Sequence, residues 1–169
     1  MVSYIFVFNN PQSMEPNKKS QSAETGMLIR KPVGEVFEAF IDPVITTKFW
    51  FTKSTGKLEK GKQVTWTWEM YNVSSEADVK DIIPNKKIEI EWGGAADDRL
   101  TVEWTFKALS DQSTFVNIRM DGFTGDIETV VEKVSGSVGG FTWVLAGLKA
   151  YLEHNIQLNL IADRFPEGK

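Results

Sequence analysis

Residues 63–70 read Gln-Val-Thr-Trp-Thr-Trp-Glu-Met, with an apolar side chain at every second position. The same alternation recurs at 88–92 (IEIEW), 100–106 (LTVEWTF) and 116–120 (VNIRM). A period of two is typical of antiparallel strands that have one dry face and one wet face. Turn residues separate these segments, so we expect consecutive hairpins, with a further, less regular strand at 76–82.

Before these strands, the apolar period changes to that of a helix. Thr25–Lys31 predicts a short first strand that ends at Pro32, and apolar residues at three- and four-residue spacing predict a helix over 33–41. Asp42-Pro43 ends that helix, because the residue before a proline is pushed out of the α region. Val44–Phe51 predicts a second short helix.

The last part of the chain predicts one long helix. Asp126 is a candidate N-cap, and an apolar stripe follows at spacings of three and four residues: Phe141, Leu145, Leu148, Leu152 and Ile156. The tryptophan face of the sheet is the large dry surface that can bury this stripe. We therefore predict a single α+β domain over 24–165. In it, a curved antiparallel sheet wraps around the C-terminal helix, and two short helices follow the first strand.

Three glycines, Gly136, Gly139 and Gly140, interrupt the helical pattern. Each costs up to about 1 kcal/mol relative to alanine inside a helix. Two interpretations stay open. Either the helix begins near Gly139 and the glycines form a junction, or they bend the helix or form the flexible rim of a pocket.

Composition restricts the classes of site. The chain of 169 residues has no cysteine and one histidine, which excludes disulfides, thiolate zinc sites and multi-histidine metal centres. Its net charge of −4 gives no basic surface for nucleic acid, and no run approaches the ~20 apolar residues of a membrane span. We expect a cytoplasmic protein without cofactor or metal. Residues 1–23 are expected to form an N-terminal extension, either an added strand at Tyr4–Phe8 or a mobile arm.

Three stretches of the chain resemble a known family. They are 31–43 (KPVGEVFEAFIDP) followed by Phe49-Trp50, the segments 88–92 and 100–106, and 140–152 (GFTWVLAGLKAYL). In this order they resemble the helix-grip fold of the START-like and Bet v 1-like (SRPBCC) superfamily, and within it the family related to the activator of Hsp90 ATPase. Phe141 stands where family members usually have tryptophan. The resemblance implies two functions: a stress-related co-chaperone of an Hsp90-type ATPase, or a cyclase or hydrolase of the same superfamily.

The tryptophans of the dry face have two interpretations. They either form a packed core or, as the resemblance favours, leave a cavity between sheet and helix, because bulky rings rarely close every gap. Such a cavity would take a small hydrophobic ligand such as a lipid, a polyketide or an aromatic metabolite. The residues expected to line it are Phe40, Trp50, Trp66, Trp68, Met70, Trp92, Trp104, Phe141, Leu145 and Leu148.

The sequence contains no recognisable catalytic set. His154 lies off the apolar stripe near the expected helix end, where we expect a surface residue. Asp81 is the carboxylate whose strand position comes closest to the cavity, as an enzyme would require. The leading hypothesis is a non-enzymatic binding protein, with the co-chaperone and the enzyme as alternatives.

Overall fold

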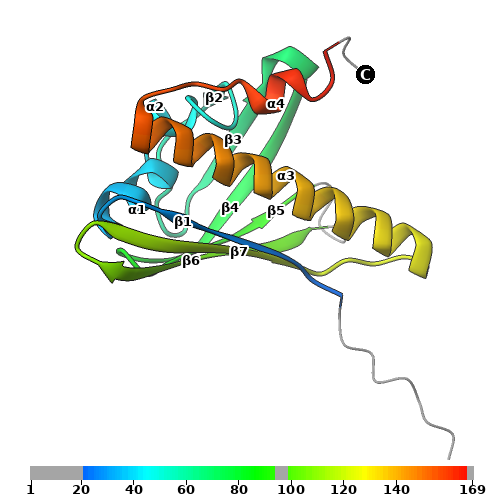
Figure 1. Ribbon diagram of the computed structural model, residues 1–169. Helices are drawn as coiled ribbons and strands as arrows, with labels where there is room; N and C mark the ends of the chain where they lie inside the picture. The colour runs from blue at the N-terminus through cyan, green and yellow to red at the C-terminus, as the bar shows by residue number, and fades with distance from the viewer. Residues whose placement is uncertain (1–20, 94–98, 167–169) are drawn as a thin grey trace, which may run out of the picture.

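The computed structural model describes residues 21–93 and 99–166. The predicted strand or arm within residues 1–20 and the loop at 94–98 lie outside these ranges. The elements are β1 (Ala23–Ile29), α1 (Val33–Ile41), α2 (Pro43–Thr46), β2 (Lys53–Ser54), β3 (Gln63–Trp68), η1 (Glu69–Tyr71), β4 (Val73–Ile83), β5 (Lys87–Trp92), β6 (Leu100–Ser110), β7 (Ser113–Asp121), α3 (Ile127–His154) and α4 (Leu160–Asp163). Figure 1 shows α3 lying across one face of a curved sheet, with α1 and α2 at one end. This confirms the predicted α+β helix-grip fold.

The strands form one antiparallel sheet in the order β1-β7-β6-β5-β4-β3-β2. The alternating pattern places its apolar residues inward as predicted: Trp66, Ile90 and Val102 are each at most 1% exposed. Strand β4 shifts register between Val79 and Asp81. An extra residue at such a bulge breaks the alternation, which explains why β4 is less regular in the sequence.

Helix α3 is one unbroken helix of 28 residues. The carboxylate of Asp126 accepts a hydrogen bond from the backbone N–H of Thr129 at 2.8 Å, which confirms the predicted N-cap. Gly136, Gly139 and Gly140 all lie inside the helix, so a helix that begins near Gly139 is wrong. The helix ends at His154, which is exposed as predicted, because Asn155 adopts the left-handed conformation.

Three local predictions are wrong. Helix α2 ends at Thr46 rather than Phe51, since the consecutive side chains of 49–51 are all buried and one face of a helix could not bury all three. Met70 lies in the short η1 turn, where strand alternation has stopped, and is 37% exposed. Ile156 lies beyond the end of α3 and is exposed, so it does not extend the apolar stripe.

The chain turns back after α3. Asn155 and Asn159 have φ angles of 56° and 53°, and this pair of left-handed residues directs α4 back against α3. The hydroxyl of Tyr71 donates a hydrogen bond to the main-chain carbonyl of Ile161, and the rings of Tyr71 and Phe165 lie 5.8 Å apart. These contacts attach the C-terminal segment to η1, directly after strand β3. Within residues 21–93 and 99–166, no helix combines the length and hydrophobicity needed to cross a membrane.

Candidate functional site

A pocket of about 690 Å³ lies between α3, the concave face of the sheet and the C-terminal segment. A second hollow of about 610 Å³ shares all its lining residues with this pocket except Val73 and Ser75, so the space continues toward β4. Exposed lining residues on the β7–α3 connection and on α3 form a mouth: Gly122, Thr124, Lys133 and Gly136. A volume of several hundred Å³ is typical of sites for small molecules.

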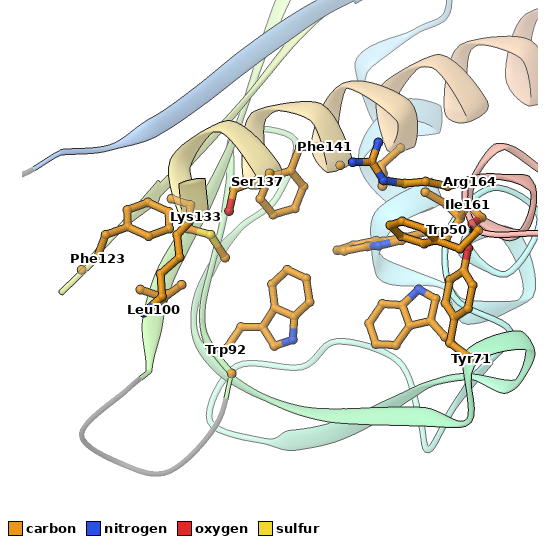
Figure 2. Close-up of a pocket in the computed structure, with 18 of the residues that line it drawn as sticks. Trp50, Tyr71, Trp92, Leu100, Phe123, Lys133, Ser137, Phe141, Ile161 and Arg164 are labelled. Carbon is orange, nitrogen blue, oxygen red and sulfur yellow. Dashed lines mark hydrogen bonds between the residues drawn. The ribbon is translucent and has the colours of Figure 1, made fainter. Parts of the chain in front are cut away.

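Aromatic rings form the inner wall of the pocket. Figure 2 shows Trp50, Trp92 and Phe141 pointing into one space beneath α3. The Trp50 ring centroid lies 5.8 Å from that of Trp92 and 6.1 Å from that of Phe141, and the Trp68 and Trp92 rings stack at 6.2 Å. These spacings are typical of favourable aromatic pairs, so the wall consists of rings packed against one another and is apolar.

Two glycines of α3 widen the pocket on the side of the helix. Gly136 and Gly140 line the pocket on the same helix face as Ser137 and Phe141, four residues apart. A Cβ atom built on either glycine would meet no heavy atom within 4 Å. The glycines therefore leave space that larger residues would occupy. This supports the interpretation of the glycines as the rim of a pocket over that of a junction.

The C-terminal segment closes one end of the pocket. Ile161, Arg164 and Phe165 line it there, together with Tyr71 from η1. The Arg164 guanidinium lies over the Trp143 ring at 4.6 Å from its centroid and 5.2 Å from that of Phe165. Cation–π contacts of this kind hold the segment against α3.

Few polar groups reach the pocket. The indole N–H of Trp92 donates to the Ser75 hydroxyl at 2.6 Å, and Lys133 Nζ donates to the Thr124 carbonyl at 3.4 Å. Among the described residues, Lys133 and Arg164 are the only charged residues of the lining. An apolar wall with a few polar groups can bind and orient a molecule by shape and by a small number of directed contacts.

The structure divides the predicted site residues into three groups. Four of them line the pocket: Trp50, Trp68, Trp92 and Phe141. Five are buried in the core beside it without lining it: Phe40, Trp66, Trp104, Leu145 and Leu148. Met70 lies on the other side of η1, away from this pocket. Both interpretations of the tryptophans therefore hold in part, since some rings fill the core and others face open space.

Sequence reasoning missed the contribution of the C-terminal segment. Leu100 and Met120 belong to the alternating dry face and could have been included from that pattern. The signal for the segment itself is weaker: the apolar pair Leu160-Ile161 and the aromatic Phe165 follow the end of the long helix. Their place over the pocket depends on the turn at 155–159, which periodicity does not reveal.

Asp81, the carboxylate considered for catalysis, does not line the pocket. Its two oxygens lie 2.8 Å from Lys60 Nζ and 3.1 Å from Lys87 Nζ. Hydrogen bonds from these two ammonium groups lower the pKa of Asp81 to about 2. The group is thus held as a paired carboxylate on the outer part of the sheet. No cluster of metal-ligating side chains occurs in the part of the chain that the structure describes.

Known proteins share this architecture. Residues 30–153 match the family model of the activator of Hsp90 ATPase homolog 1-like proteins. The crystal structure of the protein SSP2350 from Staphylococcus saprophyticus is 28% identical, with a TM-score of 0.70 over 82% of this chain and 96% of that one. No curated protein sequence matches significantly.

Two further solved structures share the fold at lower identity. An Hsp90 activator from Plasmodium falciparum is 17% identical, with a TM-score of 0.61 over 78% of this chain and 96% of that one. DynU16, a protein of the dynemicin biosynthetic locus, is also 17% identical, with a TM-score of 0.67 over 80% of this chain. The match spans 48% of DynU16. Because the family model covers most of the domain, the chain belongs to the activator of Hsp90 ATPase homolog 1-like family.

Proposed function

We propose that this protein binds a small hydrophobic molecule in the pocket beneath α3. The observation that carries the proposal is a space of about 690 Å³ walled by Trp50, Trp68, Trp92 and Phe141. Such a wall is stabilising for an apolar guest, because binding removes apolar surface of both partners from water. The likeness to a protein of the dynemicin biosynthetic locus supports a role with small molecules.

Two neighbouring glycines of α3 provide a direct test. Gly140 lines the pocket and Gly139 does not, yet a Cβ at either position meets nothing within 4 Å. Leucine at 140 would project into the pocket, whereas leucine at 139 would leave it open. Both substitutions also remove a glycine from a helix interior, so they change helix propensity equally.

The measurement is a titration with the neutral apolar dye N-phenyl-1-naphthylamine, followed by its fluorescence and by that of the tryptophans. We expect saturable binding that Gly140→Leu weakens by about tenfold or more, because overpacking a filled site costs about 1–3 kcal/mol. Gly139→Leu should bind as the unmodified protein does. Absent binding, or equal affinities of the two variants, would remove the pocket as the site.

A co-chaperone function is the second candidate. The family match and the likeness to an Hsp90 activator support it. It predicts that an excess of this protein raises the ATPase rate of an Hsp90-type chaperone and forms a stable complex with it. A flat rate together with no complex on gel filtration would dismiss this candidate.

A further inference from the structure

The charges around the pocket are unevenly distributed. Acidic residues outnumber basic ones in the chain, 23 to 19. Nevertheless, the described lining contains Lys133 and Arg164 and no aspartate or glutamate. Figure 2 shows the two cations on opposite sides of the pocket, Lys133 beside Leu100 and Phe123, and Arg164 beside Ile161. A guest in this space therefore meets positive charge at either end and no negative charge from the lining residues within 21–93 and 99–166.

Arg164 differs from the other arginines of the chain. Arg30, Arg99 and Arg119 each lie within 4.0 Å of a carboxylate oxygen. Arg164 has no such ion pair with any described residue and instead lies over the Trp143 and Phe165 rings. These rings orient the planar guanidinium, and its N–H groups donate no hydrogen bond to any described residue. A fixed guanidinium of this kind is suited to a carboxylate, sulfonate or phosphate group.

Lys133, the second cation of the lining, also has no carboxylate partner among the described residues. Its one hydrogen bond goes to the Thr124 carbonyl at 3.4 Å, a long contact that leaves two of the three ammonium donors unused. By contrast, most lysines of residues 31–87 are ion-paired, as Lys57 is with Asp42 and Lys87 with Asp81. Lys133 thus supplies a charge at the pocket mouth that no carboxylate of the described residues pairs with.

We infer that the natural ligand is an amphipathic anion: an apolar body that lies between the tryptophans, with one acidic group that Arg164 or Lys133 binds at the rim. This inference rests on the proposed function and narrows its ligand class. A neutral lipid or hydrocarbon would form no ion pair with either cation, whereas the acidic group of an anion would pair with one of them.

A pair of dyes with the same apolar body tests the charge separately from the pocket. N-phenyl-1-naphthylamine is neutral, and 8-anilinonaphthalene-1-sulfonate is the same molecule with a sulfonate. We expect the sulfonate to bind more tightly, with a preference that decreases as sodium chloride is added. Arg164→Gln and Lys133→Gln should each reduce the affinity for the sulfonate. The larger of the two reductions should be about threefold to tenfold. Lys133→Gln should not change the affinity for the neutral dye by a similar factor. Arg164→Gln also removes the ring contacts of the C-terminal segment, so both dyes should lose affinity, and the sulfonate should lose more.

Lys107→Gln is the matched control, because Lys107 is an exposed lysine of β6 that does not line the pocket. Its effect on both dyes should be negligible. If the neutral dye binds at least as tightly as the sulfonate and both rim variants leave this ratio unchanged, the anion inference is wrong while the apolar pocket stands. If neither dye binds, the proposed function itself is wrong.

Discussion

The phenol hydroxyl of Tyr71 donates a hydrogen bond to the main-chain carbonyl of Ile161, 90 residues further along the chain. This contact joins η1, at the end of β3, to α4, and both residues line the pocket. The Tyr71 ring also lies edge-on to Phe165, at 5.8 Å between centroids. The end of the pocket is thus closed by a segment that one side chain connects to the sheet.

Tyr71→Phe removes this hydrogen bond and keeps the ring contact. We expect a loss of about 0.5–1.5 kcal/mol in the free energy of unfolding, the usual contribution of one hydrogen bond. The local readout is hydrogen exchange at the Asp163 amide, which donates to Asn159 within α4 and should exchange faster in the variant. Tyr151→Phe is the control, since the Tyr151 hydroxyl makes no hydrogen bond with the described residues. Unchanged exchange at Asp163 would contradict a fixing role for Tyr71.

Replacing either of two glycines of α3 by alanine should change the free energy of unfolding, and the two changes should have opposite signs. A Cβ at Gly139 meets open space, so Gly139→Ala should stabilise the protein by up to about 1 kcal/mol through helix propensity. A Cβ at Gly147 would lie 3.1 Å from Phe49 Cβ and 3.2 Å from the Phe49 carbonyl oxygen. Gly147→Ala should therefore destabilise by about 1–3 kcal/mol, because the close packing of α3 on that turn must open. Urea unfolding measures both, and equal signs would refute the argument.

Asp126→Ala should lower the melting temperature. The Asp126 carboxylate accepts the Thr129 N–H, and this hydrogen bond lowers the pKa of Asp126. Loss of an N-cap of this kind should reduce Tm by about 2–4 °C in a domain of this size. Asp126→Asn keeps an acceptor oxygen and should recover most of the loss at neutral pH. If calorimetry gives the same Tm for all three proteins, the N-cap does not stabilise α3.

Asp81 should make stability depend on acid pH. Its pKa is lowered from 3.8 to about 2 by Lys60 and Lys87, so the folded state favours the ionised carboxylate. The resulting stabilisation is present above the unfolded pKa of about 3.9 and is lost as pH falls through the folded value.

Asp81→Asn removes this dependence. The difference in urea midpoint between the unmodified protein and Asp81→Asn should therefore be larger at pH 5 than at pH 2.5. A difference that stays constant across this range would show that the ion pairs do not contribute.

The sequence predicts the sheet and the long helix well because both depend on local periodicity. Alternation places Trp66 and Ile90 inward, and a single polar residue, Asp126, marks the start of α3. Met70 shows the limit of this reasoning, since Asn72 adopts φ 50° and η1 replaces the last strand positions. The alternation of polar and apolar residues continues to Met70, but the backbone there is no longer a strand. The alternation therefore no longer indicates which side chain points inward.

The candidate site is only half predictable. Trp50, Trp68, Trp92 and Phe141 are found from the dry face and the family resemblance. The roles of Tyr71, Arg164 and Phe165 depend on a contact between segments 90 residues apart, which no local pattern encodes. The sequence shows that Gly136 and Gly140 are unusual in a helix, but only the position of α3 over the sheet shows what they leave empty.

The open positions on α3 make guest size an adjustable property. A Cβ atom at Gly136 or Gly140 would face the pocket and meet no heavy atom within 4 Å. Alanine, valine and leucine at these positions would therefore shorten the available space in steps. Such a series would leave the sheet untouched, so receptors for progressively smaller guests could be made from this scaffold by changing two codons.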